Sequence, residues 1–349
     1  MAQSTIRVLI LGYASCFERY IRFVLGQWSD QTFQIQRHDF PPPHNPDLVF
    51  YTYWEKTHHK YKNRSRLIFM SGEAADVHKY AYSHLIIDCK LPLHLRPPQV
   101  PFVFLPFFAL SFWERYRHTP QDLIKPETLS LTTPKSKFCA FMYNHDVAFR
   151  NDLFRRINQY KHVDALGKCM NNTRLSAQQL KQKRFLYQEG QVTFYDTAVD
   201  EYRPYKFMIA CENCHVDGYV TEKIINGMLA GCIPIYSGAP DIAKYFNPKS
   251  MICVDSFPSP QAALDYIIKV DQNDELYNQM LREPWFPDNK LPSFFDGSEV
   301  LDRIKSVMKQ PLSTTTPTAS LLANPLLLLQ HRPPPKVRRG HQIKRRRRR

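Results

Sequence analysis

The sequence predicts an α/β protein made of two successive units, each built on a parallel sheet. Short apolar runs alternate with amphipathic or polar stretches, a proline-rich segment interrupts them at residues 119–136, and the alternation then begins again. Continuous apolar runs of this length are typical of parallel strands that are buried on both faces. The chain of 349 residues is long enough for two domains, so we expect two Rossmann-like units with a cleft between them.

The first unit is predicted to occupy residues 1–118. Its clearest helix is expected over residues 16–25, where Tyr20 and Val24 recur on the apolar side. The expected strands are the apolar runs at residues 6–13, 47–53, 66–73, 84–89 and 100–108.

The second unit is predicted over residues 137–310, after a linker at residues 119–136 that contains Pro120, Pro126 and Pro134. Helices are expected over residues 147–160 and 222–229. The expected strands are residues 138–143, 162–167, 205–212 and 232–238.

The positive charge of the chain is concentrated in its last residues. The formal net charge is +15, and residues 331–349 hold ten basic and no acidic residues, which leaves +5 for residues 1–330. The segment 311–349 is rich in Pro and Thr, then Leu, then Arg, and is expected to be disordered. Such a tail suits an anionic membrane surface or a nucleic acid, and the leucines at 326–329 beside the cations favour the membrane.

Nucleic-acid binding by the folded part would need basic residues interleaved with aromatic ones, which a net charge of +5 does not indicate. No run reaches the roughly 20 apolar residues of a membrane span, because Pro101 and Pro106 interrupt the longest candidate. The apolar stretch at residues 8–14 is too short for a signal-peptide core and is predicted as the first strand. The expected location is therefore cytoplasmic.

A haem-attachment motif, Cys-x-x-Cys-His, occurs at Cys211, Cys214 and His215. This chemistry belongs to exported proteins, and eight irregularly spaced cysteines indicate reduced cytosolic thiols instead. Cys139, Cys211 and Cys253 lie in apolar segments, where a free cysteine packs as a small hydrophobic residue. A thioredoxin-like use would need the pair at a helix start in a much smaller fold. A c-type haem protein and a redox protein remain the less favoured alternatives.

The stretch that follows this motif predicts a binding site for a phosphate-bearing ligand. No Gly-x-Gly-x-x-Gly and no Walker loop occurs, so side chains and helix ends must hold the phosphates. Residues 213–221 connect the carboxyl end of a predicted strand to a helix that Thr221 is expected to cap. Ligands bind at the carboxyl ends of strands in such folds, and a helix N-terminus favours an anion.

Three side chains near this helix start suit a nucleotide sugar. Lys223 adds a positive charge, Glu222 can accept hydrogen bonds from a sugar diol, and Tyr219 can pack on a ring or donate to a phosphate oxygen. The alternative is that Glu222 and Lys223 are ordinary surface residues of a first helical turn.

Residues 205–257 closely resemble the donor-binding signature of the α-1,3-fucosyltransferases, particularly the bacterial Helicobacter type, and residues 137–172 resemble the family's other signature. The similarity is weaker over residues 1–136 and absent from the tail. The resemblance implies a GT-B fold, with two Rossmann-like domains facing across a cleft. It also implies inverting transfer of L-fucose from GDP-fucose.

The resemblance assigns donor contacts to four positions. Asn213, Tyr219, Glu222 and Lys223 coincide with donor-binding residues of the bacterial members. Glu222 would accept from the ribose hydroxyls, while the other three would hold the diphosphate and the fucose. These roles are implied by the family and not by the spacing of the residues.

Lys168 falls where the family has an arginine on the diphosphate. Lysine keeps the charge but loses the bidentate fork of arginine, which weakens the expected contact. Arg174 nearby is a candidate to compensate.

No cofactor is expected, because no Asp-x-Asp occurs to hold Mn²⁺ on a diphosphate. The pair His58 and His59 lacks carboxylate company and is expected at the surface. Lys168, Lys223 and the helix dipole would offset the charge of the leaving group, with Mn²⁺ at most a weak stimulant.

Inverting transfer needs a base, for which the resemblance points to Glu73. Ser71, Gly72 and Glu73 follow the predicted strand and should lie at its carboxyl end, facing the cleft. The alternative role for Glu73 is that of an acid in the first turn of a helix capped by Ser71. Other carboxylates of the first unit that could act as the base are Asp39, Glu55 and Asp88.

The resulting hypothesis is an inverting α-1,3-fucosyltransferase acting on the GlcNAc 3-OH, or alternatively the 4-OH, of an N-acetyllactosamine-type glycan. The product would be a Lewis-type structure, with a lipopolysaccharide precursor as the natural acceptor. The basic tail would place the enzyme on the inner face of a bacterial membrane.

Overall fold

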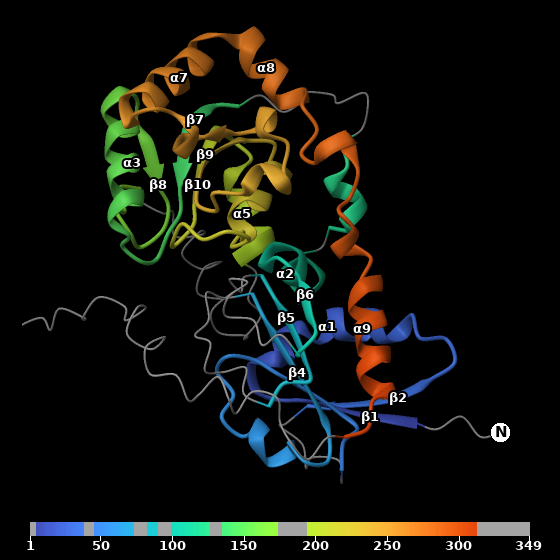
Figure 1. The fold of residues 1–349 in the computed structure, drawn as a ribbon. Helices are drawn as coiled ribbons and strands as arrows, with labels where there is room; N and C mark the ends of the chain where they lie inside the picture. The colour runs from blue at the N-terminus through green and yellow to red at the C-terminus, as the bar shows by residue number, and fades with distance from the viewer. Residues whose placement is uncertain are drawn as a thin grey trace, which may run out of the picture.

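The structure, a computed structural model, describes residues 5–37, 45–72, 82–89, 99–116, 118–125, 135–173 and 194–312. Within these ranges the chain forms two parallel β-sheets, each flanked by helices (Figure 1). The predicted α/β class is therefore confirmed.

The first sheet has the strand order β2-β1-β3-β4-β5-β6, and every pair in it is parallel. The five apolar runs predicted in the first half each form one of these strands, with shorter bounds than expected. The strands are β1 (Thr5–Ile10), β2 (Thr32–Arg37), β3 (Leu48–Tyr51), β4 (Arg66–Ser71), β5 (Leu85–Asp88) and β6 (Phe102–Phe104).

Two elements of the first unit differ from the prediction. β2 reads TFQIQR and lies at the sheet edge, where half-exposed positions remove the continuous apolar run that marks a buried strand. The run at residues 100–108 was predicted as one strand, but the strand ends at Phe104 and helix α2 (Phe107–Arg115) begins. Pro106 precedes this helix in an extended conformation, which suits a residue without a backbone N–H.

The first sheet is covered differently on its two faces. Val8 and Ile10 of β1 belong to the large apolar core shared with α1 (Glu18–Gly26) and α2. Leu9 lies in a smaller cluster on the other face, which receives Tyr61 from the 3-10 helix η2 (His58–Tyr61). The side chains thus alternate between the two faces, as in any strand.

The surface position expected for the pair His58 and His59 is only half correct. His59 is exposed, but His58 is buried and stacks on the ring of Tyr51 with 4.2 Å between ring centroids. A histidine can be buried in this way because the flat face of its ring packs on another aromatic ring.

The second sheet has the strand order β11-β10-β9-β7-β8 and is also parallel. In β9, Phe207 and Ile209 face a core shared with α3, α7 and α8, whereas Met208 and Ala210 face the core that includes residues of α5 and α6. The strands are β7 (Lys137–Phe141), β8 (Val163–Ala165), β9 (Tyr205–Cys211), β10 (Ile233–Ser237) and β11 (Ile252–Cys253). The helices are α3 (Ala148–Tyr160), α5 (Phe194–Tyr202), α6 (Glu222–Leu229), α7 (Pro260–Gln272) and α8 (Asp274–Arg282).

The last helix, α9 (Ser298–Lys309), returns to the first sheet, as Figure 1 shows. Its Ile304 is buried in the core that contains β1. The Nε of Arg66, the first residue of β4, donates to the carbonyl oxygen of Val307 over 3.3 Å. Residues 298–309 therefore stabilise the first unit although they follow the second in sequence.

The connection between the units is fixed at Lys125. Its Nζ donates to the carbonyl oxygens of Leu281 and Glu283, and Asn289 exchanges two hydrogen bonds with its backbone. Burial lowers the pKa of Lys125 to about 8, because a largely dehydrated ammonium group is costly to charge. Lys125, which leads from the first sheet to the second, is therefore hydrogen-bonded to residues 281–289, which lead back to the first sheet.

Residues 313–349 lie outside the described residues, so the prediction of a disordered tail is not tested. Within the described ranges, no helix has both the length and the apolar character needed to cross a lipid bilayer.

The two units meet at the carboxyl ends of their strands. Gly218, after β9, has φ +76°, and a Cβ atom there would lie 2.3 Å from the carbonyl oxygen of Cys89, after β5. The N–H of Phe108 donates to the carbonyl oxygen of Val220 over 3.1 Å. The hydroxyl of Tyr116 donates to the side chain of Asn226 over 2.6 Å. These contacts join α2 of the first unit to the segment around the start of α6.

We expect Gly218→Ala to lower the melting temperature measurably, because alanine would meet a backbone atom and adopt an unfavourable φ. The conformational term alone is about 1–2 kcal/mol, and the close approach to Cys89 adds to it. Circular dichroism at increasing temperature measures the effect.

Gly26→Ala is the matched control, because Gly26 ends α1 and has no atom within 4 Å of its added Cβ. Alanine there should be neutral or stabilising by up to about 1 kcal/mol. Equal melting temperatures for the two variants would contradict a tight contact at Gly218.

Candidate active site

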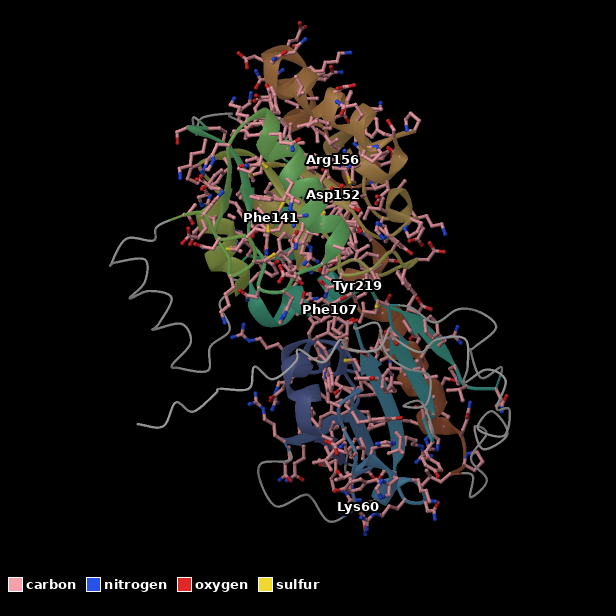
Figure 2. All side chains as sticks on the ribbon, turned by 90° about the vertical axis from the view of Figure 1, so that its left-hand side faces the viewer. Lys60, Phe107, Phe141, Asp152, Arg156 and Tyr219 are labelled. Carbon is pink, nitrogen blue, oxygen red and sulfur yellow. The ribbon has the colours of Figure 1, made fainter. Side chains whose placement is uncertain are left out.

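The loop at residues 213–221, called here the β9–α6 loop, lies where the two sheets meet. It begins at the carboxyl end of β9 and ends at α6, and its Tyr219 is only 3% exposed. Figure 2 shows Tyr219 and Phe107 at the junction of the two units, with Lys60 at the far end of the first. Gly72, just after β4, lies against the ring of Phe107, so the carboxyl ends of β4 and β5 also reach this junction.

A buried carboxylate, Glu212, holds the end of this loop. It is 0% exposed, and its two oxygens accept from the backbone N–H of Thr221 over 2.8 Å and from the hydroxyl of Thr221 over 2.7 Å. Sequence reasoning missed Glu212 as a functional residue. The available signal was an acidic residue directly after the apolar run at residues 207–211, since a buried carboxylate requires partners.

This arrangement corrects the role expected for Thr221. Its hydroxyl makes no capping bond to α6. The hydroxyl instead donates to Glu212 and accepts from the Nζ of Lys223 over 2.7 Å. The charged partners on either side attract the hydroxyl more strongly than a backbone N–H does.

Lys223 is an ion-paired residue at the start of α6. Its Nζ lies 3.2 Å from Glu212 and 3.4 Å from Glu222. Burial lowers the pKa of Lys223, but the negative charges of Glu212 and Glu222 outweigh it and keep that pKa above its ordinary value. Lys223 is therefore positively charged at any physiological pH.

Arg150 of α3 supports the other end of the loop. It is 1% exposed, and its Nη2 donates to the carbonyl oxygens of Cys211 and Glu212 and, over 2.7 Å, to Oδ1 of Asn213. The guanidinium also lies over the ring of Tyr143 at 3.9 Å. Sequence reasoning missed this residue, because nothing distinguishes it from the other arginines of an amphipathic helix.

The structure brings four of the predicted site residues together. Asn213, Tyr219, Glu222 and Lys223 all belong to the β9–α6 loop or the first turn of α6. Asn213 is exposed as a residue but fixed by Arg150 through its side chain.

Lys168 is exposed and follows β8, which is separated from β9 by β7. It therefore lies at the same sheet edge, about two strand spacings of roughly 4.8 Å from the loop. Arg174, its expected companion, lies outside the described residues.

The predicted base, Glu73, also lies outside the described residues, which end in this region at Gly72. Two of its rivals can be placed. Asp88 is fully buried and accepts from the N–H of Cys89, whereas Oε1 of Glu55 accepts from the N–H groups of Lys56 and Thr57. Asp39 is outside the described residues.

The cysteine pair does not form an accessible motif. Cys211 is fully buried within β9, where burial raises the pKa of its thiol, and Cys214 is only partly buried. The predicted packing of Cys139 and Cys211 as small hydrophobic residues is confirmed, whereas Cys253 is only partly buried. His215 contacts Ser237 through Nε2 at 3.0 Å. In the part of the chain that the structure describes, no three His, Cys, Asp or Glu side chains gather in a way that could hold a metal ion.

Comparisons with known proteins find a family model that matches most of the second unit. Residues 132–293 match the family model described as "Glycosyltransferase family 10 (fucosyltransferase) C-term". The chain is 40% identical over 194 residues to a "Putative fucosyltransferase R654" of Acanthamoeba polyphaga mimivirus, covering 54% of this chain and 30% of that protein. It is 46% identical over 79 residues to "Alpha-(1,3)-fucosyltransferase FucT" of Helicobacter pylori, covering 23% of this chain and 16% of that protein.

The matched regions thus span less than a third of the length of either relative. Among solved structures, the chain resembles an α1,3-fucosyltransferase crystallised with GDP-fucose, with a TM-score of 0.64 and 20% identity, covering 89% of this chain and 92% of that one. This likeness establishes the GT-B arrangement of the fold.

We expect Arg150→Lys to destabilise the protein by roughly 2–4 kcal/mol, because lysine cannot reproduce the forked donor and leaves buried carbonyl oxygens unpaired. Asn213 and the end of β9 would lose their support. Chemical denaturation measures the effect.

The matched control is Arg156→Lys on the same helix. Arg156 pairs with Asp152 in an exposed i,i+4 contact on α3, and both are labelled in Figure 2. This change should stay within about 0.5 kcal/mol. A similar small effect at Arg150 would show that its hydrogen bonds do not fix the loop.

Proposed function

Because residues 132–293 match the model of glycosyltransferase family 10, the fucosyltransferases, we propose that this chain transfers L-fucose from GDP-fucose to a hydroxyl group of a glycan. The observation that carries the proposal is the β9–α6 loop. It presents a charged lysine and a carboxylate beside a helix N-terminus, at the edge where both sheets end. This is the edge at which α/β folds bind their ligands.

In the proposed reaction the acceptor oxygen attacks the anomeric carbon of fucose while the bond from that carbon to the diphosphate breaks. The acceptor proton passes to a base and GDP leaves, so the configuration is inverted. The proposed base is Glu73, which directly follows Gly72 at the carboxyl end of β4. Glu55 is a weaker candidate because Oε1 of its carboxylate already accepts three hydrogen bonds.

Donor binding would exchange the partners of Lys223. Its contact with Glu222 is the longer and more exposed of its two ion pairs, with Glu222 24% and Glu212 0% exposed. A diphosphate can replace Glu222 as the outer partner of Lys223, which frees Glu222 to accept from the ribose hydroxyls. The first N–H groups of α6, which lack helical partners, would add to the stabilisation of the diphosphate.

Asn213 and Tyr219 would act on the donor in different ways. The amide of Asn213 is oriented by Arg150 and can hydrogen-bond the fucose or the diphosphate. The buried position of Tyr219 suits a residue that shapes the loop and offers at most its edge to the donor. Lys168, exposed at the same sheet edge, is proposed as an outer phosphate contact.

We further propose that the acceptor is an N-acetyllactosamine-type glycan such as a lipopolysaccharide precursor. The attacking group would be the 3-OH of its GlcNAc or, alternatively, the 4-OH. Incubation with GDP-fucose and a panel of type 1 and type 2 lactosamines, followed by NMR of the products, tests both donor and linkage. Absence of GDP release with every acceptor would refute the activity. Attachment to an anionic membrane surface through residues 331–349 stays a prediction.

We expect Lys223→Ala to reduce kcat/KM by roughly 10²-fold or more, because it removes a preorganised charge that acts on the leaving group. GDP affinity should fall with it. Lys244→Ala is the control, since Lys244 is an exposed lysine of the same unit paired with Asp241. If calorimetry finds GDP bound equally well by both variants, the diphosphate does not lie at α6.

Glu73→Gln should reduce transfer by roughly 10²- to 10⁴-fold, because glutamine keeps the shape but cannot take the acceptor proton. The dissociation constant for GDP should remain within about threefold, since Glu73 and Lys223 belong to different units. Glu55→Gln, measured in parallel, should retain most activity. The opposite ranking of the two variants would move the base to Glu55.

A further inference from the structure

The most exposed large apolar side chain in the part of the chain that the structure describes is Trp54, at 60%. Its indole meets the ring of Tyr53 edge-on, with centroids 4.8 Å apart and planes at 84°. An indole has a large apolar area, so a ligand that covers it removes much apolar surface from water and is stabilised accordingly.

Trp54 lies at the sheet edge where the candidate active site is built. Tyr51, the last residue of β3, pairs with Phe69 of β4. Trp54 follows Tyr51 by three residues, as Gly72 follows Phe69, so the ends of the two neighbouring strands place them at the same edge. Glu73 comes next after Gly72 in the sequence.

The loop that carries Trp54 is internally braced. Oε1 of Glu55 accepts from the N–H of Lys56 over 2.9 Å, and from the N–H and hydroxyl of Thr57 over 2.6 and 2.7 Å. The other oxygen of Glu55 approaches Gly12, which follows β1, closely enough that a Cβ there would lie at 2.6 Å. The indole is therefore presented on a preformed turn, which limits the entropy lost on binding.

Sugar rings are suited to such a surface. A pyranose carries hydroxyl groups around its rim and a patch of C–H groups on one face, and the electron-rich face of an indole attracts C–H groups. The end of β3 lies one strand, roughly 4.8 Å across the sheet, from the end of β4 at Gly72, which is near enough for the two strand ends to contact one sugar ring.

On this geometry, and resting on the proposed function, we propose that Trp54 is the platform on which a pyranose ring of the acceptor glycan stacks. GDP-fucose, held by the second unit, would not contact the indole.

Trp54→Ala should raise the KM for N-acetyllactosamine about tenfold or more. The kcat at saturating acceptor should change by less than about threefold, and the dissociation constant for GDP should not change. Trp54→Phe retains an aromatic face and should restore most of the acceptor affinity. A rise in the KM for GDP-fucose equal to that for the acceptor would overturn the assignment, as would an unchanged acceptor KM.

Leu312→Ala is the matched control. Among the described residues, Leu312 is the other large exposed apolar residue, at 36%, and it follows Gln310, whose carbonyl oxygen accepts from Arg66 at the amino end of β4. It therefore lies beyond the opposite edge of the same sheet. This variant should leave every kinetic constant unchanged.

Tryptophan fluorescence gives a readout that requires no catalysis. Titration with N-acetyllactosamine in the absence of donor should change the emission of the unmodified chain saturably. The change should vanish in Trp54→Phe and persist in Trp28→Phe, because Trp28 packs against Phe33 away from this loop. A signal that persists in Trp54→Phe would overturn the proposal.

The two experiments separate this inference from the proposed function. A saturable Trp54 signal without any fucose transfer would support the sugar platform and refute the enzyme activity. Transfer that is indifferent to Trp54→Ala would support the activity and refute the platform.

Discussion

The candidate site depends on the hydrogen bonds that Thr221 makes to a carboxylate with no access to water. Glu212 accepts from both the backbone and the hydroxyl of Thr221, and the same carboxylate neutralises Lys223. Burial raises the pKa of Glu212, and the positive charge of Lys223 and the hydrogen bonds from Thr221 offset part of this shift. The start of α6 is thereby attached to the end of β9, and the loop between them has both ends fixed.

The network extends below the loop through Arg150. Its guanidinium joins the last carbonyl oxygens of β9 to the side chain of Asn213, so α3 and the loop cannot move independently. This cluster holds two cations and two carboxylates, whose charges balance: Arg150, Lys223, Glu212 and Glu222. A balanced cluster can be buried without a bound ion, whereas an unpaired charge there would cost several kcal/mol.

Much of the fold could be predicted from the sequence because most of the strands are continuous apolar runs and the α6 helix begins at a polar pair. β2 could not, since its half-exposed edge position produces no such run. Residues 105–108 were assigned to a strand because apolar residues continue past Pro106 into α2, and periodicity cannot separate two apolar elements that adjoin.

Prediction of the candidate site had a different weakness. Residues at the start of α6, such as Lys223, could be found from local charge and a family resemblance. Arg150 could not, because its partners are 61 to 63 residues away in sequence and only the folded sheet brings them together. The hydroxyl of Thr221 was assigned to the helix cap because Glu212 was not recognised as its partner.

The contact of Gly218 with Cys89 determines where the second unit meets the first sheet. It places the β9–α6 loop on the end of β5, and β4 and β3 follow in strand order. With roughly 4.8 Å between neighbouring strands, the β9–α6 loop, Gly72 and the loop of Trp54 lie in this order along one edge, over about 10 Å. In the proposed reaction, the glycosyl donor and the sugar ring that carries the attacking hydroxyl would lie along this edge in the same order. The strand order of the parallel sheet can therefore set the distances between the groups that would contact the donor and the acceptor. This requires that Gly218, which has no side chain, lets the second unit approach the end of β5.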